Sequence, residues 1–359
     1  MRIGILTFQN ADNYGAILQC LALSKYLENQ GYQVEVLDYK QPYIERVYKP
    51  WRFDIVLNNV FKIRFLAGYF MKVLPKTWKR HKAYQKFRKK HLHLSLPIYN
   101  KEDIPVKDVY IIGSDQVWSE HCTDGDDDIY WGCFDHHCGR VIGYAISSTL
   151  SSAQNKEKGL VLNRLKNFTK LSFREKEVKY FFNKEFNYNA PIVLDPTLLP
   201  LGEYWESLAS EVSEKDSYIL TYFLHKEKDS PSFKERIRKI ASLYNMKIID
   251  IFEVANSPDR FLSYIKGASL ILTTSFHATV FSIIFHKQFF SINSHDGREH
   301  RYRDLLDSLQ LHHRFIDDME SLSDVMAPDK SRIDYDDVVI RLNELQINSI
   351  KYLEESLKV

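Results

Sequence analysis

Residues 2–38 have the sequence RIGILTFQNADNYGAILQCLALSKYLENQGYQVEVLD, and this stretch decides the fold of the first half of the chain. The apolar run 2–8 is typical of a buried parallel strand. After a polar loop, apolar residues at helical spacing predict a helix over 15–29, closed by Gly31. The alternating segment 32–38 predicts a second strand, so the stretch is a βαβ unit.

The same alternation of strands and helices continues along the chain. Further strands are predicted over 108–112, 140–146, 169–173, 191–194, 217–224, 246–252, 269–273 and 288–292. Helical patterns cover 155–167, 231–244, 258–266, 276–286, 301–310 and 334–357. The fold class is therefore α/β, with two Rossmann-like domains facing a cleft. In such sheets ligands bind beyond the carboxyl ends of the strands.

This pattern divides the chain into three parts. We expect an N-terminal α/β domain over 1–205, which carries a basic helical insertion at 45–95. A C-terminal α/β domain follows over 206–330, and a C-terminal helix occupies 331–359. The cleft between the two domains is the default place for a binding site.

The composition narrows the class of protein. The chain has 359 residues, of which 44% are hydrophobic and 27% charged, as in a folded globular protein. A net charge of +2 gives no global signature of nucleic-acid binding. Four cysteines suit a reducing compartment. The N-terminus lacks a signal-peptide pattern and no long apolar window occurs, so we expect a cytoplasmic protein.

The charge is concentrated in one segment. From Glu45 to Lys90 there are 14 Lys or Arg against two acids, a net charge of +12, so the other 313 residues sum to −10. The segment is also rich in aromatic residues, and it predicts two or three amphipathic helices. A solvated helical insertion, an oligomer interface and a surface that sits on an anionic membrane all remain open.

Polar residues follow two strands of the N-terminal half. The loop that ends in Asn13 and Tyr14 precedes a helix, where backbone N–H groups favour a polar or anionic ligand. Asp115, Gln116 and Trp118 lie in the segment GSDQVW, whose polar groups and indole ring suit a sugar. The alternatives are a helix N-cap at the first place and a strand-end turn with a core tryptophan at the second.

Cations and a histidine follow other strands. Arg174 is a planar donor suited to carboxylate or phosphate. His277 lies in the first turn of an apolar helix behind hydroxyl residues that include Ser275, where it can act as a general acid or base. The alternative is a capping or core histidine. The cations that follow it and suit a phosphate are Lys287, Arg298, Arg301 and Arg303.

The sequence favours neither a cofactor nor a metal. The glycine-rich fingerprints of dinucleotide and P-loop sites are absent. The acidic run 124–128 contains D-x-D, and the Cys and His residues between 121 and 138 lack the spacing of a zinc site. We therefore expect no cofactor and no metal.

As an ordered set, these segments resemble the polysaccharide pyruvyl transferase family. The resemblance covers about 1–315 and rests on short segments that occur in the same order. They are NYGAILQ at 13–19, GSDQVW at 113–118 with YAISS at 144–148, SFRE at 172–175, LDPT at 194–197, SFHA at 275–278 and RYRDLL at 301–306.

The resemblance implies a fold like that of GT-B glycosyltransferases and a reaction. Members transfer the pyruvyl group of phosphoenolpyruvate to sugar hydroxyls of a capsule, exopolysaccharide or lipid-linked precursor, form a pyruvate ketal and release phosphate. No cofactor is implied. A lipid-linked acceptor would give 45–90 a purpose at the inner face of the cell membrane.

The resemblance also assigns roles. It makes His277 the catalytic histidine and Arg174 the donor-binding arginine, with Arg301 at the place of a family arginine and Arg298 nearest to a family lysine. Lys287 is added from local charge, and Ser275 from its place beside the histidine. The residues expected to contact the acceptor are Asn13, Tyr14, Asp115, Gln116 and Trp118.

Two competing functions share these features. A GT-B glycosyltransferase would use the same fold and cleft with a nucleotide sugar as donor. A non-catalytic membrane-surface or assembly protein would keep the fold without the reaction. A donor screen distinguishes the glycosyltransferase, which would release a nucleoside diphosphate. Replacement of His277 distinguishes the non-catalytic protein, which would be unaffected.

Overall fold

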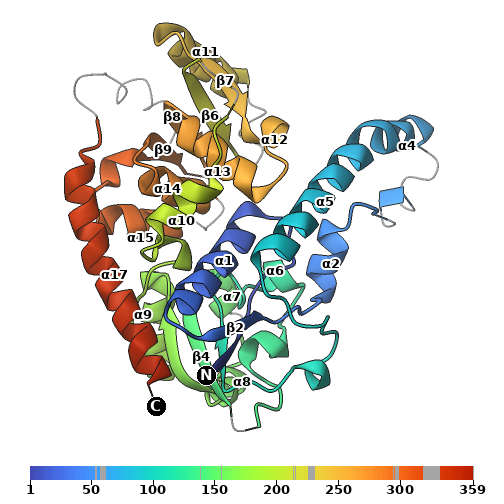
Figure 1. The fold of residues 1–359 in the computed structure, drawn as a ribbon, viewed down its shortest axis with the longest axis vertical. Coiled ribbons are helices and arrows are strands. Elements are labelled where there is room, and N and C mark those ends of the chain that lie inside the picture. Colours follow the sequence, from blue (N-terminus) through green and yellow to red (C-terminus); the bar gives the residue numbers. More distant parts are fainter. Residues whose placement is uncertain are drawn as a thin grey trace.

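The computed structural model describes most of the chain and contains two α/β halves (Figure 1). The described residues are 1–52, 55–56, 62–137, 139–154, 156–212, 214, 216–224, 231–293, 295, 299–317 and 332–358. Arg298 therefore lies outside the described residues, and its predicted role cannot be placed in the fold.

Each half is built on a five-stranded parallel sheet. The first sheet has the order β2-β1-β3-β4-β5. Its strands are β1 (Arg2–Leu6), β2 (Gln33–Val36), β3 (Val109–Ile112), β4 (Arg140–Ile146) and β5 (Phe168–Phe173). The second sheet has the order β10-β9-β8-β6-β7. Its strands are β6 (Tyr218–Tyr222), β7 (Lys247–Asp250), β8 (Leu270–Thr273), β9 (Gln288–Ile292) and β10 (Phe315–Ile316).

The two sheets have the same topology. In each, the second strand pairs outside the first, and the third, fourth and fifth follow on the other side. This is a common doubly wound order, and its ligand crevice opens where the first and third strands diverge. That point lies between β1 and β3 in one half and between β6 and β8 in the other.

Helices connect the strands. In the N-terminal half they are α1 (Tyr14–Asn29), α2 (Pro42–Tyr48), α4 (Ile63–Gly68), the π-helical turn η1 (Tyr69–Val73), α5 (Leu74–His91), α6 (Glu120–Thr123), α7 (Leu150–Gln154), α8 (Lys158–Leu165) and α9 (Lys176–Phe186). Those that follow are α10 (Gly202–Leu208), α11 (Pro231–Leu243), α12 (Ile251–Val254), α13 (Pro258–Gly267), α14 (Phe276–Ile284), α15 (His300–Ser308) and α17 (Tyr335–Leu357).

Two of the predicted strands differ from the structure. The segment 191–194 pairs with β5 through the single bridge between Phe173 and Ile192, and the chain then turns at Asp195. The predicted strand 246–252 ends at Asp250, because that carboxylate caps the short helix α12 by accepting from the backbone N–H of Phe252.

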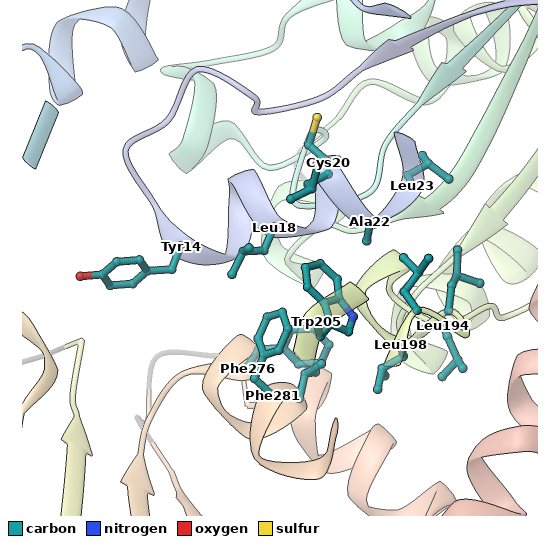
Figure 2. Packing of buried hydrophobic residues seen from close by; sticks show 14 of the residues in the cluster. Tyr14, Leu18, Cys20, Ala22, Leu23, Leu194, Leu198, Trp205, Phe276 and Phe281 are labelled. Atoms are coloured by element: carbon teal, nitrogen blue, oxygen red, sulfur yellow. The ribbon is translucent and has the colours of Figure 1, made fainter. Parts of the chain in front are cut away.

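One apolar core joins the halves. Figure 2 shows Leu18 of α1 together with Trp205 of α10 and Phe281 of α14, and these residues belong to a single buried cluster. The Trp205 and Phe281 rings meet edge-on with centroids 5.1 Å apart. Since this cluster contains residues of both sheets, tight packing holds the two halves together beneath the cleft.

The C-terminal helix ties the halves a second time. Near its start, Tyr335 stacks on His286 of the C-terminal half. Near its end, the Tyr352 hydroxyl donates to the carbonyl oxygen of Gly143 in β4 at 2.8 Å. Helix α17 therefore spans both domains, as the long helix at the edge of Figure 1.

The basic segment forms a projecting rod. Helix α4, the turn η1 and helix α5 follow one another without a break from residue 63 to 91 and extend away from the N-terminal sheet (Figure 1). In the described part of the chain, no helix is long and apolar enough to cross a membrane.

Candidate active site

The site lies where both sheets have their crevice. A cavity of about 270 Å³ opens between the halves. From the N-terminal half it is lined by Asn13, Asp115 and Gln116, which follow β1 and β3. From the C-terminal half it is lined by Ser275 and His277, which follow β8. The prediction that strand ends supply the site is thus in accord with where these five side chains lie.

His277 occupies the first turn of α14 and is almost fully buried. Its ring lies against Gly15 of α1: a Cβ atom at position 15 would come 2.0 Å from His277 Nδ1. Any side chain larger than hydrogen at position 15 would force the ring to move, because real Cβ contacts are never that short. The segment NYGAILQ therefore has a glycine at position 15 because the His277 ring of the other domain packs against it.

Asp195 stands on the other side of the histidine. Its Oδ2 lies 3.6 Å from His277 Nε2 and accepts a hydrogen bond from Arg174 Nη1 at 2.5 Å. Its Oδ1 accepts from the backbone N–H and the hydroxyl of Thr197 at 3.0 and 2.6 Å. Burial would raise the pKa of Asp195, but His277, Arg174 and Thr197 outweigh it and hold the pKa well below its usual range.

Arg174 follows β5 and bridges two acids. Its Nε donates to Glu175 Oε1 at 3.2 Å, and the same oxygen accepts from the Ser147 hydroxyl at 2.6 Å. Burial works against the charge of Arg174, yet Glu175 and Asp195 raise its pKa, so the guanidinium stays charged. Burial raises the pKa of Glu175, and the opposing effect of Arg174 does not cancel it.

Three buried atoms of this cluster make no hydrogen bond within the described part of the chain. Among the described residues, Arg174 Nη2, Glu175 Oε2 and His277 Nε2 have no hydrogen-bond partner. A buried polar group without a partner is costly, and such groups in a native site are commonly completed by a ligand. The cluster is thus prepared to donate to an anion and to exchange a proton.

Phe276 separates this cluster from a second arginine. The Arg174 and Arg301 guanidinium carbons lie 4.9 and 5.9 Å from the centre of the Phe276 ring. Arg174 and Asp195 line a smaller cavity of about 80 Å³, and Phe276 and Arg301 line both cavities. Arg301 therefore lies near Arg174, with both guanidinium groups against the Phe276 ring.

Three of the predicted contacts lie elsewhere. Trp118 is in the core, stacked on Trp131 with centroids 3.8 Å apart, so it presents no face to a sugar. Tyr14 is fully buried between the halves, where its ring stacks on Phe261 at 4.4 Å. Lys287 precedes β9 at the edge of the sheet opposite His277, where burial lowers its pKa despite nearby Glu206.

The structure adds residues that the sequence analysis did not select. Asp195 and Glu175 belong to the segments LDPT and SFRE, which were recognised without a role for either acid. Tyr48 of α2 lines the large cavity, and burial raises the pKa of its phenol to about 12, which keeps it a hydrogen-bond donor. The sequence contains no signal for Tyr48, because it lies in the basic insertion and does not directly follow a predicted strand.

The acidic run 124–128 is engaged by cations. Asp126 accepts from Lys156 and from Arg164, and Asp128 also pairs with Arg164. Within the described ranges, no group of three or more His, Cys, Asp or Glu is arranged to hold a metal ion.

The family comparison agrees with the order of these segments. The model of the polysaccharide pyruvyl transferases matches residues 13–296, which is most of the chain. The chain belongs to the polysaccharide pyruvyl transferase family. It is therefore a transferase enzyme with a pyruvyl transferase role, and the segments from Asn13 to the Ser275–Ala278 turn fall within the match. No curated protein matches this pyruvyl transferase.

Solved structures share only distant similarity with it. The S. aureus MnaA–UDP structure has a TM-score of 0.48 and 11% identity, covering 100% of this chain and 98% of that one. UDP-GlcNAc 2-epimerase from Methanocaldococcus jannaschii has a TM-score of 0.46 and 12% identity, covering 96% of this chain and 93% of that one. Spinosyn rhamnosyltransferase SpnG has a TM-score of 0.41 and 8% identity, covering 100% of this chain and 96% of that one. Similarity at this level says nothing about the donor or the acceptor.

Proposed function

We propose that this enzyme transfers the pyruvyl group of phosphoenolpyruvate to two hydroxyls of a sugar in a surface polysaccharide or its lipid-linked precursor. The observation that carries the proposal is the buried cluster around Arg174, in which Arg174 Nη2 and His277 Nε2 have no hydrogen-bond partner among the described residues. A donor with a phosphate and a carboxylate would supply anionic partners for these two atoms.

The reaction requires two proton transfers. A sugar hydroxyl adds to C2 of phosphoenolpyruvate while the methylene carbon C3 takes up a proton. The C2–O bond to phosphate then breaks, and a second hydroxyl closes the ketal. Of the two hydroxyl protons, one ends on the methyl carbon and the other on the released phosphate.

We assign the proton transfers to His277. A histidine changes its charge near neutral pH, so it can give a proton to C3 and accept one from a hydroxyl. Asp195 is a positioning residue here, because its buried carboxylate lies 3.6 Å from His277 Nε2 and is itself held by Arg174 and Thr197. Arg174 and Arg301 hold the donor, and their positive charges stabilise the negative charge of the leaving phosphate.

The acceptor belongs on the other wall of the cavity. Asp115 and Gln116 offer carboxylate and amide groups that suit sugar hydroxyls, and the Tyr48 phenol adds a donor. Asn13 caps α1 through its Oδ1, which leaves only its Nδ2 for the acceptor. We place the reaction on the cytoplasmic side of the membrane, where a lipid-linked precursor would present its sugar. The mechanism uses no cofactor and no metal.

Phosphate release from phosphoenolpyruvate tests the proposal. The purified enzyme is incubated with phosphoenolpyruvate and a panel of glycosides and lipid-linked sugars, in parallel with His277→Ala. We expect phosphate release that depends on one acceptor and is lost in the variant. Release of a nucleoside diphosphate from a nucleotide sugar by the same enzyme, without phosphate from phosphoenolpyruvate, would contradict the proposal.

A further inference from the structure

The projecting rod of residues 63–91 has a composition unlike the rest of the chain. It contains ten Lys or Arg and no acid, and the sequence has no acid between residues 55 and 101. Seven of its lysines are exposed. They are Lys72, Lys76, Lys79, Lys82, Lys86, Lys89 and Lys90. No neighbouring acid on the rod compensates this charge, so the rod repels cations and attracts an extended anionic surface.

Large apolar side chains are exposed among these lysines. The exposed fractions are 48% for Phe65, 76% for Met71 and 48% for Trp78. At the same end, Trp51 is 40% exposed and packs on Phe70 with ring centroids 5.6 Å apart. Exposing apolar groups of this size to water is unfavourable, and moving them into an apolar medium lowers the free energy.

The two kinds of side chain share one face of α5. Trp78, Lys82, Lys86 and Lys89 follow one another at three- and four-residue steps, which places them in one stripe. The opposite stripe is buried and includes Tyr84 and Phe87. Helix α5 therefore packs its aromatic side on its own domain, and its outer side combines lysines with the indole ring of Trp78.

The inner side of the rod is fixed to the active-site loop. Arg88 Nη2 donates to Asp12 Oδ1 at 2.8 Å, and His81 Nδ1 lies 2.7 Å from Asp12 Oδ2. Arg80 Nη2 donates to the backbone carbonyl of the same aspartate at 2.9 Å. Since Asp12 precedes Asn13, a surface bound by the rod would be held at a fixed position relative to the cavity.

We propose that the outer face of this rod docks on an anionic lipid bilayer. Clusters of four to eight lysines or arginines are attracted to anionic lipid headgroups, and exposed aromatic side chains beside them can enter the membrane interface. Interfaces between proteins are instead depleted in lysine, so a second copy of this chain is the weaker occupant. This docking does not depend on the identity of the donor, and lipid binding alone tests it.

Sedimentation with lipid vesicles measures the docking directly. The full chain is mixed with vesicles of phosphatidylcholine alone or with about one third phosphatidylglycerol. We expect strong binding to the anionic vesicles only, weakened by salt. Absence of binding to the anionic vesicles would overturn the proposal.

Variants of the outer face identify the surface. Lys79→Ala, Lys82→Ala and Lys86→Ala together should lower the partition coefficient about 100-fold, since each lysine near an anionic surface contributes about 1 kcal/mol. Met71→Ala with Trp78→Ala should lower it about tenfold, through lost apolar burial. All five side chains are exposed, so the melting temperature should be retained.

A matched control removes the same charge elsewhere. Lys166→Ala, Lys170→Ala and Lys184→Ala are exposed replacements outside the rod and should leave vesicle binding unchanged. Equal loss in both triple variants would overturn the proposal, since net charge alone would then explain binding. A dimer in light scattering without lipid, lost on Met71→Ala with Trp78→Ala, would also overturn it. Transfer to a water-soluble acceptor should be the same in the rod variants, which separates docking from catalysis.

Discussion

The two halves of this pyruvyl transferase have the same strand order but bring different chemistry to the cavity. The switch point of the first sheet presents Asn13, Asp115 and Gln116, and that of the second presents Ser275 and His277. Arg174 and Asp195 come from the first half by sequence, yet they lie against His277. A shared topology therefore fixes where a site forms, and the residues at the strand ends decide what each wall does.

The largest effect should come from the histidine of the second wall. His277→Ala removes the group to which we assign proton transfer, and we expect turnover to fall about 10²- to 10⁴-fold. Steady-state kinetics with phosphoenolpyruvate and a saturating acceptor measure this. Turnover within a factor of two of the wild type would show that the two walls do not differ as described.

Arg174 tests the donor side of the same comparison. Arg174→Ala leaves Asp195 and Glu175 buried without their partner, so it should cost about 3–5 kcal/mol of stability. Arg174→Lys keeps the charge but loses the fork that bridges two acids. We expect this variant to fold and to bind phosphoenolpyruvate more weakly, measured by titration calorimetry. Donor affinity equal to that of the wild type would remove Arg174 from the donor site.

Gly15 tests whether the two walls depend on each other. Gly15→Ala places a Cβ atom 2.0 Å from His277 Nδ1, so the ring must move and turnover should fall at least tenfold. Gly68→Ala in α4 is the matched control, because its Cβ would meet nothing within 4 Å. The control should keep its activity. Full activity in Gly15→Ala would mean that the histidine is not held by α1.

The depressed pKa of Asp195 predicts a pH dependence of stability. The folded pKa lies below the unfolded value, so this carboxylate stabilises the fold above about pH 4, and that contribution is lost as the pH falls further. Asp195→Asn should be less stable at neutral pH and should lose less stability on acidification. Parallel denaturant titrations of both proteins from neutral to acidic pH measure this. Identical acid dependence would contradict the assigned pairing.

The smallest effect should come from the acceptor wall. Gln116→Ala removes a neutral hydrogen-bonding group, which is worth about 0.5–1.5 kcal/mol. We expect the KM for the acceptor to rise about three- to tenfold, while the affinity for phosphoenolpyruvate stays the same. A change in donor affinity with unchanged acceptor KM would reverse the assignment of the walls.

Much of the fold could be predicted from the sequence because parallel sheets have continuous apolar strands. The run 140–146 was predicted with its observed bounds, and α1 begins one residue before its predicted start. The strand after Met246 was extended too far, because the apolar residues Ile251 and Phe252 suit a strand, whereas the Asp250 cap starts a helix. Local hydrogen bonds of this kind are not visible in hydrophobic periodicity.

The site was predictable only in part. Strand-end position correctly indicated where His277, Asn13 and Asp115 lie, since parallel strands end at one edge. It could not separate a ring that faces a cavity from one that packs in the core, and Trp118 proved to be of the second kind. Residue type alone also placed Lys287 with the cations, although the start of a strand faces away from the site.

We assign the donor to the smaller cavity, at Arg174, and the acceptor to the larger one, at Asp115; Phe276 and Arg301 line both cavities. Titration calorimetry of phosphoenolpyruvate without acceptor, on the wild type, Arg174→Lys and Asp115→Asn, distinguishes the two sites. We expect equal donor affinity for the wild type and Asp115→Asn, and weaker binding by Arg174→Lys. Loss of donor affinity in Asp115→Asn as large as that in Arg174→Lys would contradict it, as would a wild type that does not bind phosphoenolpyruvate.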